Sequence, residues 1–296
     1  MRALVAGWFS FERMGATAGD LYARDLARGW LDEARVPHDV AHALPFAGGV
    51  DWRAVDPGAY SHLVFVCGPF GNGPPLTELL ERFREARLVG LDLSLVQSLD
   101  EWDPFDVLLE RDSSATARPD ISFLATEERV PVVGVVLVHP QKHPRAMHET
   151  AERLIDELLA LRPVAPVRID TRLDIANASG LRTPVEIESV IARMDAVVTT
   201  RLHGMVLALK NGVPAVVIDP IGGGDKVLRQ AVTIGWPVAF TADGASVGRL
   251  DEALTYCLSE EARAGARRVA TRAVREVGEI RERFISSLVG AGRKAR

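Results

Sequence analysis

The sequence predicts an α/β fold in which two domains pack together and face each other across a cleft. Short β-branched runs alternate with longer helical patterns along the chain, which is typical of parallel sheets built from strand–helix–strand units. The 296 residues, of which 47% are apolar, are enough to fill two ordinary cores. Ligands of such sheets bind beyond the carboxyl ends of the strands, so we expect the chemistry in the cleft.

The first half of the chain carries the elements of one sheet. The run HLVFVCG, residues 62–68, has the apolar continuity of a strand buried on both faces. Shorter apolar runs and longer helical patterns alternate around it. The expected strands are residues 2–7, 62–68, 88–91 and 106–110, and the expected helices are residues 20–34 and 76–84.

A second sheet is expected to begin at residues 130–138, whose sequence VPVVGVVLV is another continuous apolar run. The polar segment TEER precedes it, so we place the boundary near residues 125–131 and expect domains of residues 1–128 and 129–296. In the second domain we expect strands at residues 167–170, 196–200 and 214–218, helices at 144–161, 184–194 and 226–234, and a long arginine- and glutamate-rich helical stretch at 259–288.

Bulk properties exclude several classes of protein. A formal net charge of −5 argues against nucleic-acid binding, which needs a basic surface. No stretch approaches the roughly 20 apolar residues of a membrane span, and the first apolar run is too short for a signal peptide. Cys67 and Cys257 lie in apolar stretches, which favours reduced, buried thiols. We expect a soluble cytoplasmic protein, and the sequence leaves a homo-oligomer open.

The strongest chemical motif is Arg201-Leu202-His203-Gly204, where an expected strand ends and a helix begins. Helix N-termini offer unpaired N–H groups and a positive dipole end, so anions bind there. Arg201 supplies a permanent cation and His203 a group that titrates near neutral pH. We expect residues 199–214 to form the floor of the cleft. The alternative is that Arg201 pairs with the Asp195 or Asp225 region and that His203 caps its own helix.

A second motif, residues 110–114 (ERDSS), follows an expected strand of the first half and precedes Pro119 and Asp120. Arg111 would project toward the cleft and hold another anionic group. The alternative is an ordinary loop with a helix cap at Ser113 or Ser114.

Glycine-rich loops form the remaining candidates. Residues 15–20 (GATAGD) let backbone approach a ligand, with Asp20 either capping the helix or facing the substrate. Residues 67–73 (CGPFGNG) form a similar turn that also lines the expected cleft. Residues 221–226 (IGGGDK) end in Lys226, a cation at the positive end of a helix, which indicates a ligand or Asp225 as its partner, or simple exposure.

Other chemistries are disfavoured. The spacing of His139, His143 and His148, with Pro140 and Pro144 between them, gives no shared helical face, so we expect no metal there. His139 alone ends the first strand of the second domain and should face the cleft. Neither a G-x-S-x-G elbow nor a P-loop is present, which argues against a serine hydrolase and a P-loop phosphotransferase.

Taken in chain order, these motifs resemble the polysaccharide pyruvyl transferase family. That family shows Gly-Asp near the first helix, Arg-Asp-x-x-Ser followed by Pro-Asp, Arg-Leu-His at a strand end, Gly-Val-Pro, and then a lysine. The matching residues are Gly19 and Asp20, Arg111 and Asp112 with Ser113 or Ser114, Pro119 and Asp120, Arg201 to Gly204, Gly212 to Pro214, and Lys226.

The resemblance implies two Rossmann-like domains in a GT-B-like arrangement, with the acceptor side and part of the donor site in the first. It implies transfer of the pyruvyl group of phosphoenolpyruvate to hydroxyls of a sugar or glycan, forming a ketal, with no cofactor. Arg111 and Arg201 would hold the carboxylate and phosphate, and His203 would act as general acid. The other implied substrate-binding residues are Asp112, Asp120, Asp20, Gly19, His139, Gly204 and Lys226, and which carboxylate assists the hydroxyl stays open.

Two other functions fit the same residues. A nucleotide-sugar glycosyltransferase of this architecture would use Arg201 and Lys226 on a diphosphate and would have less need of Arg111. A non-catalytic protein that binds sugars or anions would keep the cleft without turnover. The chain is short for the family, and its CGPFGNG turn replaces a commoner run of glycines, which leaves the acceptor open.

Overall fold

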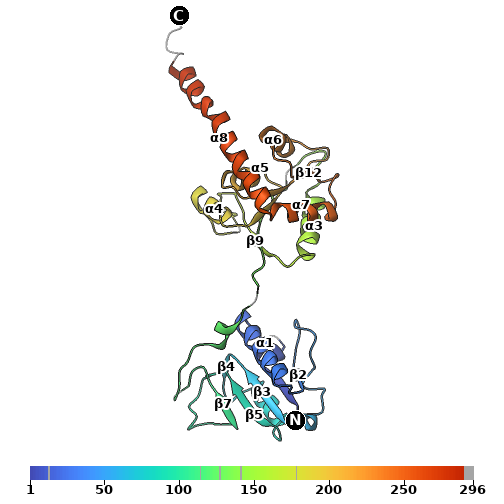
Figure 1. Ribbon diagram of the computed structural model, residues 1–296, viewed down its shortest axis with the longest axis vertical. Coiled ribbons are helices and arrows are strands. Elements are labelled where there is room, and N and C mark those ends of the chain that lie inside the picture. The colour runs from blue at the N-terminus through green and yellow to red at the C-terminus, as the bar shows by residue number, and fades with distance from the viewer. Residues whose placement is uncertain (13, 114, 127, 141, 178, 290–296) are drawn as a thin grey trace, which may run out of the picture. The chain divides into compact units, whose positions relative to one another are not determined.

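The computed structural model describes residues 1–289 except 13, 114, 127, 141 and 178. The protein is mixed α/β and divides into two compact units, Met1–Glu127 and Glu128–Arg296. Each unit holds a five-stranded sheet whose paired strands all run parallel, with helices packed on it (Figure 1). The predicted fold class with parallel sheets is therefore confirmed, and the cleft between two domains stays a prediction.

The sheet of the first unit has the strand order β2-β1-β3-β5-β7. Its central strands are short apolar runs that are buried along most of their length, as strands covered on both faces require. A two-stranded pair, β4 (Pro69–Phe70) and β6 (Ser94–Leu95), follows the ends of β3 and β5. The elements are β1 (Ala3–Ala6), β2 (His38–Val40), β3 (His62–Val66), β5 (Arg87–Leu91), β7 (Val107–Leu109), α1 (Ala18–Glu33) and α2 (Leu76–Arg82), with short 3-10 turns at Trp8–Ser10, Pro57–Ala59 and Ile121–Leu124.

The sheet of the second unit has the order β12-β11-β10-β8-β9. Strands β10 and β11 are buried at every residue, and helices α5 and α6 each follow one of them. The elements are β8 (Val132–Val136), β9 (Ala165–Arg168), β10 (Ala196–Thr199), β11 (Ala215–Asp219), β12 (Ala239–Thr241), α3 (His148–Ala160), α4 (Pro184–Ile191), α5 (Leu202–Lys210), α6 (Lys226–Ile234), α7 (Val247–Cys257) and α8 (Glu260–Val289).

The expected elements occur in the structure with small shifts at their ends. Helix α3 begins at His148 rather than at residue 144, because residues 144–145 form a turn, Ala146 forms a β-bridge with Ile221, and Met147 donates its backbone N–H to the carbonyl of Pro220. Strand β9 ends at Arg168, two residues before its predicted end, which leaves Asp170 in the loop beyond the sheet. Strands β2 and β12 and helix α7 were not expected from the sequence.

Two further expectations concern burial and membranes. Cys67 and Cys257 are both buried and free, as the sequence predicts. Within the part of the chain that the structure describes, no helix has the length and apolar character needed to span a bilayer.

Candidate functional site

A cavity of about 290 Å³ opens at the carboxyl ends of β10 and β11 in the second unit. Three residues that the sequence singled out, Arg201, His203 and Lys226, line it together. Lys142, His143 and His148 from the loop before α3 and its first turn contribute to the same wall. The rest of the lining consists of Val138, Thr200, Leu202, Asp219, Pro220, Ile221, Asp225 and Val227.

Arg201 is held at the start of α5 by the end of β10. The buried Thr199 hydroxyl accepts a hydrogen bond from the Arg201 backbone N–H at 2.9 Å and donates to the carbonyl of Val136 at 2.8 Å. The Arg201 side chain is 22% exposed, and burial lowers the pKa of its guanidinium. Within the described part of the chain, its one ion-pair contact is with Asp170 and is long at 3.5 Å, so the guanidinium is still able to bind an incoming anion.

The alternative partners of Arg201 are wrong. Asp195 accepts the backbone N–H of Val132 and lies 3.6 Å from Arg263, while Asp225 pairs with Arg229 at 2.7 Å. Both carboxylates thus serve other groups.

Asp170 joins two of the predicted residues. Its Oδ2 lies 3.0 Å from Nε2 of His139 and its Oδ1 lies 3.5 Å from the Arg201 guanidinium. The Asp170 side chain is only 10% exposed, and its Oδ1 also accepts the backbone N–H of Arg172. Sequence reasoning missed Asp170, although its place just beyond a strand is the signal that singled out Arg201. His139 is thus coupled to Arg201 through a carboxylate.

His203 lies exposed in the first turn of α5 on the cavity wall. The N-cap residue of the helix is Arg201 rather than His203, and the Arg201 side chain makes no capping hydrogen bond. Uncapped N–H groups and the positive dipole end face the region that Arg201 and His203 share. This arrangement favours an anion with a proton donor beside it.

Asp219 organises the glycine-rich loop that ends in Lys226. The carboxylate is 1% exposed, and it accepts backbone N–H groups of Ile221, Asp225 and Leu228 at 2.7–3.1 Å. The loop turns through two glycines with positive φ, at positions 223 and 224, which a side chain would strain. Sequence reasoning missed this anchoring role of Asp219.

Two ammonium groups of the cavity have no counterion among the residues that the structure describes. Lys226 is the first residue of α6, and Asp225, its expected alternative partner, pairs with Arg229 instead. Among the described residues, neither Lys226 nor Lys142 has an ion-pair partner. Cations at a helix N-terminus are unfavourable unless an anion lies nearby.

Gly204 is buried where α5 approaches the sheet. A Cβ at this position would lie 2.3 Å from the Thr199 hydroxyl oxygen and 2.9 Å from Val136 Cγ1. The structure therefore gives Gly204 a packing role, which sets the distance between Arg201 and the strand ends.

In the first unit, Arg111, Asp112 and Asp120 form a cluster, as their motif suggests. The Arg111 guanidinium donates to Asp120 at 2.6 Å, to Asp112 at 3.2 Å and to the hydroxyl of Ser94. Burial opposes the charge, but the hydrogen bonds to Asp120 and Asp112 raise the pKa of Arg111 overall. Arg111 is thus already neutralised by its own carboxylates, unlike Arg201.

The caps in this region are now assigned. Ser113 accepts the backbone N–H groups of Ala115 and Thr116 and forms a turn, while position 114 lies outside the described residues. Asp120 caps the 3-10 turn that follows, by accepting the N–H of Ser122 at 2.8 Å.

Asp20 stabilises the start of α1. Thr17 is the N-cap residue, and Asp20 Oδ2 accepts both its backbone N–H and its hydroxyl at 2.7 Å, a capping box. Asp20 is 6% exposed, so capping accounts for its carboxylate, and Gly19 lies inside the first helical turn. Their predicted contact with substrate stays a prediction.

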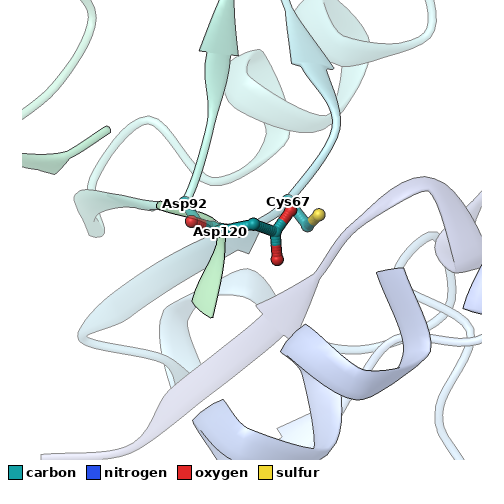
Figure 2. A group of neighbouring side chains, drawn as sticks. All are labelled: Cys67, Asp92 and Asp120. Carbon is teal, nitrogen blue, oxygen red and sulfur yellow. The ribbon is translucent and has the colours of Figure 1, made fainter. Parts of the chain in front are cut away.

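A group that the sequence did not indicate lies at the ends of β3 and β5. Figure 2 shows the side chains of Cys67, Asp92 and Asp120 as neighbours. Each offers a potential ligand atom, and these atoms lie within 4.8 Å of one another. Burial, and then the neighbouring Asp120, raise the pKa of Asp92 to about 6. Burial, followed by Asp20 and Asp120, raises the pKa of the Cys67 thiol to about 12. The one signal in the sequence was that Cys67 opens a glycine-rich turn after a strand.

Comparison with solved structures gives distant likenesses. The glycotransferase of kitacinnamycin is 14% identical, with 92% of this chain and 94% of that chain covered and a TM-score of 0.32. UDP-GlcNAc 2-epimerase of Methanocaldococcus jannaschii is 9% identical, with coverages of 94% and 99% and a TM-score of 0.32. These values are too low to carry an argument about fold or function.

Comparison with sequences is more specific. No curated protein matches this chain. Residues 109–221, which run from the Arg111 cluster past Arg201 and His203, match the model of the family described as polysaccharide pyruvyl transferase, so the resemblance seen in the sequence is confirmed over this segment.

Proposed function

We propose that this protein transfers the pyruvyl group of phosphoenolpyruvate to hydroxyls of a sugar or glycan acceptor, with formation of a ketal. One observation carries the proposal: a cavity with Arg201, Lys142, Lys226 and His203 on its wall lies within and beside the segment that matches the pyruvyl transferase family. Phosphoenolpyruvate carries a phosphate and a carboxylate, which are the groups that such a cavity binds.

The geometry of the second unit supports the roles that we propose for these residues. Arg201, half-buried with one long ion pair, gains a close counterion when a phosphate or carboxylate enters. The uncapped N–H groups of α5 add to the same attraction. Lys142 and Lys226, which have no ion-pair partner among the described residues, neutralise the rest of the donor's charge.

In the proposed chemistry, His203 gives a proton to the methylene carbon of the enol, which leaves an oxocarbenium-like carbon. One acceptor hydroxyl adds there and passes its proton back to His203. A second hydroxyl then displaces the phosphate, which leaves with the proton of that hydroxyl, and closes the ketal. In all, one C–H and two C–O bonds form, while the C=C π bond and the C–O bond to phosphate break. An imidazole suits this work because its ordinary pKa lies near neutrality.

Arg111 is a second candidate for holding an anionic group. Its guanidinium would have to exchange a carboxylate for the ligand, and Asp112, whose side chain is 53% exposed, is the easier one to release. Asp120 is better buried and holds Arg111 at the shorter distance. A cytoplasmic location and a homo-oligomer stay predictions.

Calorimetric titration of the full chain with phosphoenolpyruvate tests the donor. We expect saturable binding that Arg201→Ala weakens at least tenfold, while Arg153→Ala, which removes an exposed arginine on α3, leaves it unchanged. His203→Ala should keep most of the binding and lose phosphate release in the presence of acceptor sugars.

The same titration separates the alternatives. Binding of uridine or guanosine diphosphate without binding of phosphoenolpyruvate would contradict the proposal and favour the glycosyltransferase. Binding of phosphoenolpyruvate without phosphate release, over a broad set of glycan acceptors, would favour a non-catalytic binding protein.

A further inference from the structure

The cluster Cys67, Asp92 and Asp120 in the first unit is not used by the proposed transfer chemistry. Cys67 directly follows β3 and Asp92 directly follows β5, and these two strands are neighbours in the sheet (Figure 2). The third member, Asp120, comes from the segment after β7, the strand next to β5. Parallel strand order thus brings a thiol and two carboxylates to one edge.

The spacing of the donor atoms fits a small cation. One ligand atom from each residue lies within 4.8 Å of the others. Ligands of tetrahedral zinc are roughly 3.3–3.8 Å apart, given metal–oxygen and metal–sulfur distances near 2.1 and 2.3 Å. Small rotations of the three side chains would bring the donor atoms from within 4.8 Å to the separation that zinc ligands have.

Asp92 supplies an independent reason to place a ligand here. It is 1% exposed, its Oδ1 accepts the N–H of Ile121 at 3.2 Å, and its Oδ2 is buried without any hydrogen-bond partner among the described residues. A buried carboxylate oxygen with no donor is costly, and native structures seldom leave one. A positive group against Oδ2 would satisfy it.

The local charges are also unbalanced. Asp120 uses Oδ2 for Arg111 and Oδ1 for the backbone N–H of Ser122, and a carboxylate oxygen has more than one lone pair with which to bind a cation. Arg111 is shared with Asp112, so one guanidinium faces several carboxylates, Asp92 among them. A divalent cation would offset this excess of negative charge.

We propose that Cys67, Asp92 and Asp120 form a binding site for a borderline divalent cation of the Zn²⁺ or Co²⁺ type. A thiolate selects such ions over Mg²⁺ and Ca²⁺, which prefer oxygen ligands. Binding releases the thiol proton of Cys67 to solvent, so affinity rises with pH. The site belongs to the first unit alone and does not depend on the transferase proposal.

Titration of untagged, chelator-treated full chain with Co²⁺ tests the site, because a thiolate–cobalt bond produces a near-ultraviolet charge-transfer band that histidine and carboxylate ligands do not. We expect this band to saturate at one equivalent and Zn²⁺ to displace Co²⁺. Asp92→Asn should weaken Co²⁺ binding at least tenfold.

Cys257→Ser is the matched control, because Cys257 is the other buried thiol and lies far from the cluster in the sequence. If the charge-transfer band is retained in this variant, the thiolate that produces it is Cys67, because the chain has only these two cysteines. This assignment requires no substitution inside the cluster. Absence of the band in folded wild-type protein, its loss in Cys257→Ser, or full affinity in folded Asp92→Asn would overturn the proposal. If Asp92 and Asp120 only share a proton and bind no cation, the band would be absent in the folded wild-type protein.

Discussion

Replacing Gly204 by alanine measures how closely α5 packs against the strands that position Arg201. The added Cβ would lie 2.3 Å from the Thr199 hydroxyl oxygen and 2.9 Å from Val136 Cγ1. Real Cβ atoms do not approach oxygen so closely, and both neighbours belong to buried strands. The helix, the strand or both have to move.

The size of the effect follows from two opposing terms. Overpacking of a well-packed core costs about 1–3 kcal/mol. Alanine gains up to about 1 kcal/mol over glycine inside a helix. Because Thr199 also holds the Arg201 backbone, its displacement adds lost hydrogen bonds. We expect a net destabilisation of about 2 kcal/mol.

Urea unfolding of wild type, Gly204→Ala and Gly278→Ala checks this. Gly278 lies exposed in α8, where an added Cβ would meet no described atom within 4 Å, so alanine there should be neutral or stabilise slightly. In a Thr199→Ala background, Gly204→Ala should cost less, because the closest atom is gone. Equal stability of Gly204→Ala and wild type, or an unchanged cost in the Thr199→Ala background, would refute the packing role.

Three other changes have defined outcomes. Asp219→Ala should lower the free energy of unfolding by about 3 kcal/mol, seen in urea melts, because three backbone N–H groups lose a buried acceptor. Burial, and then Arg24, lower the pKa of His42 below 6.5, so the unfolded chain binds more protons and stability falls as pH drops through 6.5. The His42→Gln variant should lose this part of the pH dependence of the free energy of unfolding. Parallel profiles of unfolding free energy against pH for the variant and the wild type would contradict the prediction. Thr183→Ala should cost about 1 kcal/mol in thermal melts, since Thr183 and Glu186 form a capping box on α4, and an unchanged melting temperature would argue against the cap.

The sequence by itself determined the fold class and most of the strands. Runs such as HLVFV and AVVT are apolar at nearly every position because parallel strands are covered on both faces, and this leaves a signal that needs no tertiary information. Strands β2 and β12 were not predicted, because each has only three residues, which is too short to show a periodic pattern, and two of the three residues of β2 are polar. They exist because neighbouring strands offer them a hydrogen-bonding edge.

The sequence also placed Arg201, His203 and Lys226 at strand ends and helix starts, where the structure finds them on one cavity wall. Local pattern was sufficient because each residue is positioned by its own strand-to-helix junction. The sequence predicted a capping role for Asp20 but did not show that Thr17 is the N-cap residue and Asp20 its partner in a capping box, because both residue types cap helices and only the backbone shows where the helix begins.

Partnerships between distant residues were decided by the tertiary structure alone. His139, Asp170 and Arg201 follow β8, β9 and β10, and they meet because these strands lie side by side in the sheet. Cys67 and Asp92 meet in the same way at the ends of β3 and β5. From the sequence alone, one aspartate that follows a strand cannot be told from another. The order of the strands in the sheet determines which residues lie next to it. Burial then determines whether its carboxylate pairs with a cation, is shared between two groups or has no hydrogen-bond donor.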